Sequence, residues 1–127
     1  MTILLDTHTL IWFLDNDPQL PIKTRTIIET TPTVFVSIVS LWEIAIKANI
    51  GKLSLSFPFN TIEPTLNSQG ITQLPISFND LEIYLNLPLH HRDPFDRILI
   101  AQAMNHNLTF ISKDTQLTPY KIQCQWD

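Results

Sequence analysis

Four acidic side chains stand where short apolar runs end or where helices are predicted to begin: Asp6, Glu43, Asp96 and Asp114. Carboxylate oxygens are the ligands that Mg²⁺ and Mn²⁺ prefer in proteins. The chain has only two glycines, so it has no glycine-rich loop that could cradle a nucleotide phosphate through backbone amides. Clustered acids without such a loop favour a site for a divalent cation.

Each of these acids, taken alone, also has a purely structural interpretation. Asp6 could cap the helix that follows the first strand, and Asp114 could stabilise a turn. Ser40 and Glu43 fit a capping box, and Asp96 could complement a helix dipole. As a set, however, converging carboxylates would repel one another strongly unless a cation lay between them. We therefore expect all four to act as metal-binding, catalytic residues.

Asp93 lies close to this set, directly before Pro94. Proline at the first helical position needs no amide partner, so Asp93 is expected to cap the helix that follows. Asp93 and Asp96 are three residues apart and share one helical face. We assign Asp96 to the metal and Asp93 mainly to capping. A role for Asp93 in the outer coordination shell stays open.

Polar neighbours could assist the acids. The hydroxyls of Thr7 and Ser112 could orient adjacent carboxylates, although such hydroxyls often satisfy backbone groups. Positive side chains nearby could contact substrate phosphates or be solvated surface charges. These candidates are Lys47, Arg92, Arg97 and Lys113. For Lys47, an ion pair with Glu43 four residues earlier is the simpler expectation.

Other conspicuous side chains are expected to be structural. His90 and His91 precede the helix that begins at Asp93 and are predicted as loop residues. A zinc site is not expected there, because there is no nearby cysteine and no H-x-x-x-H spacing. Trp12 and Trp42 are predicted as core aromatics.

The hydrophobic pattern predicts the elements that position these residues. Predicted strands span 1–5, 34–37, 71–74, 108–112 and 120–124. Predicted helices span 7–14, 21–30, 40–50, 57–69, 77–86 and 93–107. Strands that alternate with helices indicate a parallel sheet with helices on both faces. Right-handed crossovers bring strand carboxyl ends and helix amino ends to one edge, where we expect all four acids.

Composition limits the class of protein. With 127 residues, 44% of them hydrophobic, the chain fits a single domain over residues 1–127. The net charge of −4 argues against binding nucleic acid by bulk electrostatics, although bound cations can reverse the local sign. No apolar stretch approaches the ~20 residues of a membrane span, and no signal peptide is expected. Cys124 is the only cysteine, which favours a cytoplasmic protein without disulfides.

At these residues the sequence resembles the PIN-domain ribonucleases, and within them the VapC-type toxins of bacterial toxin–antitoxin pairs. Four segments carry the resemblance in the family's order: residues 4–12, 40–47, 91–103 and 112–114. Each motif is weak alone, but four in order are specific. The resemblance implies a Rossmann-like α/β/α sandwich with a central, mainly parallel sheet. It also implies an endoribonuclease that depends on Mg²⁺ or Mn²⁺, and a homodimer inhibited by a small antitoxin that blocks the acidic pocket.

The resemblance also implies roles for the acids. Asp6 and Asp96 would be the principal ligands, Glu43 would complete the inner set, and Asp114 would hold a second metal or a water. The family often has threonine where this chain has Ser112, which keeps the hydroxyl. The expected reaction is hydrolysis of a phosphodiester by metal-activated water. RNA as the substrate follows from the resemblance and not from the acids.

Two rival functions belong to other classes. A receiver-like phospho-acceptor domain would also be a parallel α/β domain with an acidic, Mg²⁺-binding pocket. It requires an aspartate after the central strand, whereas the third strand-like run ends at Leu74, Pro75 and Ile76. The other rival is a non-catalytic binding protein that keeps the fold, because a shared fold does not decide function.

Overall fold

The computed structural model describes residues 1–91, 93–114, 120 and 122–126. Within these residues five strands form one sheet in the order β3-β2-β1-β4-β5, and every pair of neighbours is parallel. The strands are β1 (Thr2–Leu5), β2 (Thr33–Ser37), β3 (Ile71–Leu74), β4 (Thr109–Ile111) and β5 (Gln123–Gln125). Each of the five predicted strands overlaps one of them, so the predicted parallel sheet is confirmed.

Six α-helices connect the strands in the described part of the chain: α1 (Thr7–Leu14), α2 (Ile22–Thr30), α3 (Ile38–Asn49), α4 (Ile62–Ser68), α5 (Phe78–Leu85) and α6 (Pro94–His106). The helix predicted at 57–69 is shorter than expected, because Phe59–Thr61 forms a separate 3₁₀ turn. Pro64 is tolerated as the third residue of α4, since the first amides of a helix have no intrahelical partner.

The start of α3 differs from the prediction. Ser37, the last residue of β2, caps this helix by accepting a hydrogen bond from the amide of Val39 at 3.1 Å. Ser40 and Glu43 lie inside the helix, so the capping box proposed for them is wrong. The chain turns from strand to helix without a loop, because Ser37 already has the extended backbone that a cap requires (φ −77°, ψ 144°).

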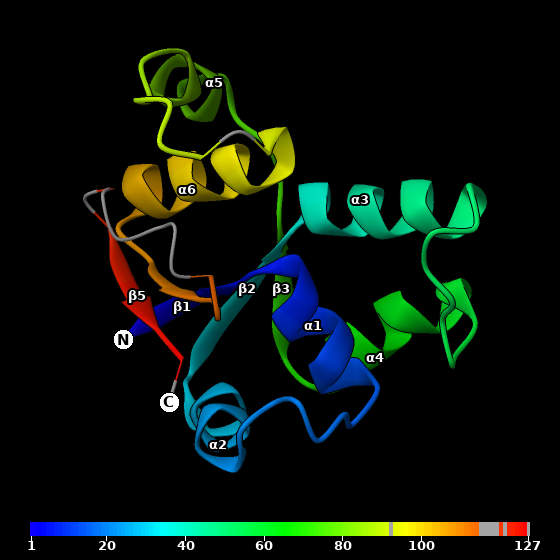
Figure 1. The fold of residues 1–127 in the computed structure, drawn as a ribbon. Helices are drawn as coiled ribbons and strands as arrows, with labels where there is room; N and C mark the ends of the chain where they lie inside the picture. Colours follow the sequence, from blue (N-terminus) through cyan, green and yellow to red (C-terminus); the bar gives the residue numbers. More distant parts are fainter. Residues whose placement is uncertain (92, 115–119, 121, 127) are drawn as a thin grey trace.

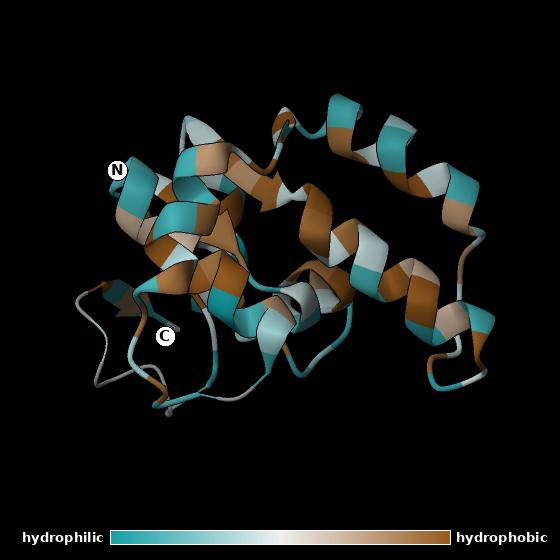
Figure 2. Ribbon diagram, turned by 90° about the horizontal axis from the view of Figure 1, so that it is seen from above, coloured by the Kyte–Doolittle hydropathy of each residue, from teal (hydrophilic) through white to brown (hydrophobic). Residues whose placement is uncertain are grey.

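The sheet lies between two hydrophobic layers, since successive side chains of a strand point to opposite faces. Ile3 and Leu5 of β1 pack with α1, α2 and α4, whereas Leu4 packs with α6 on the other face. In Figure 1, α5 covers the outer side of α6. Helices in Figure 2 alternate between hydrophobic and hydrophilic residues, as expected where one side of a helix is buried. The α/β/α sandwich predicted from the sequence is confirmed.

The order of the strands creates the place for a site. The chain passes from β1 to β2 and β3 on one side of the sheet, and later returns to β4 on the other side of β1. Connections that leave a central strand in opposite directions open a crevice at its carboxyl end. Asp6 follows β1 at this point. None of the described helices combines the length and the apolar character needed to cross a bilayer.

Asp80 fastens α5 to α6, the helix that carries Asp96. The carboxylate is fully buried and forms a capping box with Ser77. It also accepts hydrogen bonds from Asn105 at 2.8 Å and Gln102 at 3.4 Å, both in α6. Burial alone would raise the pKa of Asp80, but these hydrogen bonds outweigh it and hold the pKa below the ordinary 3.8.

Replacing Asp80 with alanine should lower the free energy of unfolding by about 2 kcal/mol, because a cap and two interhelical hydrogen bonds are lost. The matched control is Glu82→Ala, an exposed acid of the same helix, for which we expect a change within about 0.5 kcal/mol. Because folding lowers the pKa of Asp80, its contribution is present above pH ~4 and is lost on acidification. Urea unfolding at pH 7 and pH 3 tests this; equal losses in both variants would contradict it.

Candidate active site

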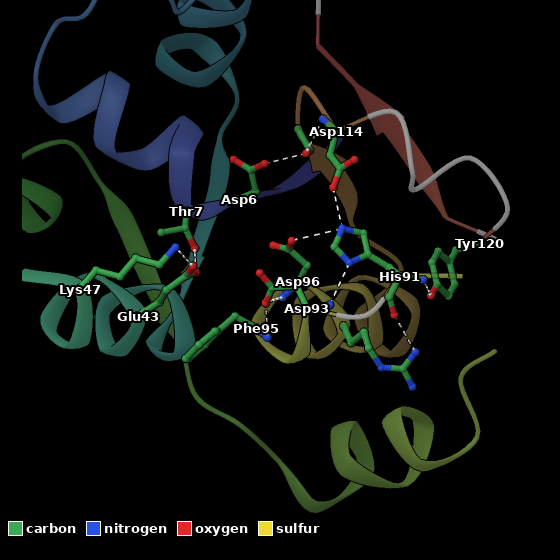
Figure 3. Close-up of polar contacts among 12 residues, drawn as sticks. Asp6, Thr7, Glu43, Lys47, His91, Asp93, Phe95, Asp96, Asp114 and Tyr120 are labelled. Carbon is green, nitrogen blue, oxygen red and sulfur yellow. Dashed lines mark hydrogen bonds and ion pairs between the residues drawn. The ribbon is translucent and has the colours of Figure 1, made fainter. Parts of the chain in front are cut away.

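A cavity of about 460 Å³ opens at the carboxyl edge of the sheet and gathers three of the four predicted ligands. Asp6 reaches it from the end of β1, Asp96 from the first turn of α6, and Asp114 from the segment after β4. The remaining lining residues are His8, Thr9, Trp12 and Lys113. Figure 3 shows these three acids around a common space, with Glu43 approaching from α3. Distant parts of the sequence therefore bring their carboxylates together.

Asp6 is fixed by hydrogen bonds to both of its oxygens. Oδ1 caps α1 by accepting from the amide of Thr9 at 2.7 Å, and Oδ2 accepts from the hydroxyl of Ser112 at 2.6 Å. Ser112 also accepts from the amide of Asp114 at 3.1 Å, so one hydroxyl links the two acids. The capping interpretation and the metal interpretation of Asp6 are compatible, because each carboxylate oxygen has a second lone pair.

Glu43 is buried beside the cavity and is also held at both oxygens. The hydroxyl of Thr7 donates to Oε1 at 2.7 Å, and the ammonium of Lys47 lies 2.7 Å from Oε2. Lys47 thus forms the ion pair that its spacing from Glu43 predicts. This hydrogen bond is the main cause of a raised pKa at Lys47, opposed by burial and assisted by the nearby acids.

His91 links the other two acids. Its Nε2 lies 2.8 Å from Oδ2 of Asp114 and 3.3 Å from Oδ2 of Asp96. Ligand atoms of these three residues all lie within 4.8 Å of one another, which is the geometry needed to share an ion. Of the four predicted ligands, Asp96 and Asp114 belong to this close group, whereas Asp6 and Glu43 lie outside it. Asp93 caps α6, as predicted, by accepting from the amides of Phe95 and Asp96.

Asp96 has the most perturbed carboxyl group of the site. Burial is the largest cause and raises its pKa to about 7 from the ordinary 3.8. The negative charge of Asp93 is the next cause, and Glu43 and Asp6 add to it, whereas His91 opposes the rise. A carboxyl group so placed takes up a proton near neutral pH, or it requires a positive charge in its place.

Arg97 does not reach the cavity, contrary to its expected role as a phosphate contact. Its guanidinium is buried, and it donates to the backbone carbonyls of Leu87, Pro88 and His91 at 3.0–3.4 Å. Arg97 lies over the ring of Tyr84 as well. Because its side chain turns back onto the loop before α6, Arg97 holds that loop in place.

The other positive candidates lie in different surroundings. Lys113 lines the cavity, is exposed, and has its ammonium 6.0 Å from the ring centre of Trp12. The side chain of Lys47 is 38% exposed. Arg92 lies outside the described residues. Lys113 and Lys47 are therefore the candidates that remain accessible to a phosphate.

Trp12 and Trp42, both predicted as core aromatics, lie in different surroundings. Trp12 is partly buried, packs against the core and forms one wall of the cavity. Trp42 is 59% exposed, and its ring packs edge to face on that of Phe95, with the ring centroids 5.4 Å apart. The expectation for Trp42 is wrong, because helical periodicity alone does not reveal which stretches of a helix another element covers.

His91 is the site residue that sequence reasoning missed. Its loop position was predicted correctly, but a loop that leads into the first turn of α6 lies at the same edge as the acids. The signal was available in its spacing, five residues before Asp96 and two before the cap Asp93.

Comparisons with known proteins identify the family and the fold of the chain. A family model described as PIN domain matches residues 3–121. The chain is 24% identical over 124 residues to ribonuclease VapC22 of Mycobacterium tuberculosis, covering 94% of this chain and 92% of that protein. It resembles a chain of DNA-bound VapBC2 from Rickettsia felis (TM-score 0.76, 14% identity, 100% of both chains). It also resembles a chain of DNA-bound VapBC from Salmonella typhimurium (TM-score 0.74, 16% identity, 98% of this chain and 97% of that chain).

The structural likenesses establish the fold, since their sequence identities are low. The family model, by contrast, spans nearly the whole sequence, including the segments that supply all four acids. This chain belongs to the PIN-domain family.

Proposed function

We propose that this chain is an endoribonuclease that depends on Mg²⁺ or Mn²⁺ and acts as the toxin of a toxin–antitoxin pair. The observation that carries the proposal is the cavity shared by Asp6, Asp96 and Asp114, in which one carboxyl group has a pKa raised to about 7. Membership of the PIN-domain family and the likeness to a protein named as a ribonuclease support RNA as the substrate.

The donors in the cavity fit a hard divalent cation. Carboxylates of Asp6, Asp96 and Asp114 supply oxygen ligands, and a cation would offset the charges that raise the pKa of Asp96. In the proposal Asp6 and Asp96 are the principal ligands, and Asp114 holds a second cation or a water. A bound cation lowers the pKa of a coordinated water and neutralises charge on a phosphate.

Hydrogen bonds from neighbouring residues fix the conformations of these carboxylates. Thr9 and Ser112 fix the rotamer of Asp6, and Thr7 fixes that of Glu43. Lys47 and Thr7 each use one lone pair of Glu43, so a second lone pair on each oxygen is left with which Glu43 would complete the inner set. Lys47 and Lys113 are the proposed contacts for substrate phosphates, because both remain accessible beside the acids.

The proposed protein partners are a cognate antitoxin and a second copy of this chain. The complexes of the structural relatives support the antitoxin, which would block the acidic cavity. An apolar cavity of about 270 Å³ between α3, α5 and α6 supports the homodimer, since apolar surface of this kind marks interaction sites. Its lining is Val39, Trp42, Ile76, Leu81, Tyr84, Pro94, Phe95 and Ile98. The proposal places the protein in the cytoplasm.

The two rival functions stand differently. A receiver-like domain is not supported, because the chain matches the PIN-domain model over residues 3–121. A non-catalytic binding protein of the same family would keep the fold and leave RNA uncut. Incubation of the purified chain with RNA, with Mn²⁺ or with a chelator, separates that function from hydrolysis.

Replacing Asp96 with asparagine should reduce RNA cleavage at least ~100-fold, because a lost ligand removes several kcal/mol of transition-state stabilisation. Glu29→Gln, which neutralises an exposed acid of α2, is the matched control and should cleave at the wild-type rate. Initial rates with Mn²⁺, together with circular dichroism to verify folding, make the comparison. Cleavage by the Asp96 variant at the normal rate would refute the assignment.

The same substitution should stabilise the metal-free protein above neutral pH. Because folding raises the pKa of Asp96, the folded protein binds more protons than the unfolded chain between pH ~4 and ~7. Stability is therefore lost as the pH rises through this window, and asparagine removes that loss. We expect the melting temperature to rise by about 3–6 °C at pH 8, for a gain on the order of 1 kcal/mol. The gain should shrink at pH 5, and a pH-independent difference would count against the buried charge.

A further inference from the structure

We propose that His91 is a positioning residue, which donates a hydrogen bond from Nε2 to Asp114, lies against Asp96 and thereby sets the separation of the two carboxylates. In this role His91 is not itself a metal ligand. The inference rests on the proposed function, because it concerns the carboxylates assigned to the cation. It adds a residue and a task that the resemblance does not supply.

The contacts of the ring determine which nitrogen carries the proton. Nδ1 of His91 accepts a hydrogen bond from the amide of Asp93 at 3.2 Å. An accepting nitrogen has no proton, so in the neutral ring the proton resides on Nε2. Nε2 is hydrogen-bonded to Asp114 at 2.8 Å, and the same nitrogen lies within ion-pair distance of Asp96 at 3.3 Å.

The same contacts argue against His91 as a ligand. A ring nitrogen binds a metal through its lone pair, so Nε2 would have to give up its proton. Moving that proton to Nδ1 would set two donors, the ring N–H and the Asp93 amide, against each other. The amide of Asp93 lies directly before α6, in a junction that the cap keeps fixed. The hard cations in question also prefer oxygen to imidazole.

The backbone of His91 is fixed on both sides of the ring. Its amide donates to the hydroxyl of Tyr120 at 2.8 Å, and that hydroxyl donates to the carbonyl of Pro88 at 2.9 Å. Its carbonyl accepts from Arg97 at 3.2 Å. The residue is 8% exposed. Figure 3 shows the ring between Asp114, Asp96 and the Asp93 junction.

A positioning role explains why so many hydrogen bonds hold His91 in the loop before α6. Two carboxylates that repel each other would turn apart in the absence of a cation. An imidazole that is hydrogen-bonded to Asp114 and lies 3.3 Å from Asp96 counters that tendency, but only if the ring cannot move. Tyr120, Arg97 and the Asp93 amide supply that rigidity, as partners of ligands commonly do in metal sites.

The first test uses the wild-type protein with no substitution. Two-bond ¹H–¹⁵N spectra of the metal-free protein should show His91 as the tautomer protonated at Nε2. With Mn²⁺ bound, electron spin echo modulation should show no directly coordinated histidine nitrogen. A coordinated ¹⁴N signal that disappears on ¹⁵N-histidine labelling, and that persists in a His8→Gln variant, would make His91 a ligand and overturn the proposal.

The second test measures Mn²⁺ affinity in the absence of RNA, by the electron paramagnetic resonance of free Mn²⁺. His91→Leu should weaken binding about 10–100-fold, as loss of a ligand's hydrogen-bond partner does. His91→Gln, which restores an N–H donor, should recover part of that loss. The control Glu29→Gln alters an exposed acid of α2 outside the cavity lining and should bind as the wild type does.

The outcomes distinguish this inference from the proposed function. Wild-type protein that binds no Mn²⁺ would defeat the proposed function itself. Wild-type binding that His91→Leu leaves unchanged would defeat only the positioning role. If the leucine variant fails to fold by circular dichroism, the spectra of the wild-type protein still decide between donor and ligand.

Discussion

Carboxylates from three separated stretches of the chain share one cavity at the carboxyl edge of the sheet, where their negative charges oppose one another. Burial is the largest cause of the raised pKa of Asp96, because it removes the water that would stabilise the charged carboxylate. The negative charge of Asp93, and then those of Glu43 and Asp6, add to the effect of burial, and the pKa of Asp96 rises to about 7. A proton or a cation can relieve the repulsion. The proposed activity depends on the second of these outcomes being preferred when a divalent cation is present.

The fold tolerates this concentration of charge by supplying a donor to each acid. Asp6 receives the Thr9 amide and the Ser112 hydroxyl, and Glu43 receives Thr7 and Lys47. The imidazole of His91 is hydrogen-bonded to Asp114 and lies within ion-pair distance of Asp96. These donors come from helix starts and strand ends, which a parallel sheet collects at one edge. The topology that brings the negative charges together therefore also brings the hydrogen-bond donors that stabilise them.

The sequence predicted the fold and the convergence of the acids, because both follow from strand–helix alternation and from acids placed at strand ends. It did not predict features that depend on side-chain direction. Arg97 and Lys113 look alike in sequence, yet one is buried against loop carbonyls and the other lines the cavity. The capping box at Ser40 failed because Ser37 caps α3 one turn earlier. The direction of a side chain and the position of a helix cap depend on tertiary packing, which a local sequence pattern does not predict.

Calorimetric titration of the metal-free protein with Mn²⁺, in two buffers of different ionisation enthalpy, tests the central claim most directly. If the cation replaces a proton on the repelling carboxylates, binding near pH 7 should release up to about one proton, and affinity should fall as the pH decreases below 7. Asp6→Asn should weaken the binding. Binding with equal affinity at pH 5.5 and pH 7.5 and without proton release, or no binding at all, would contradict the account.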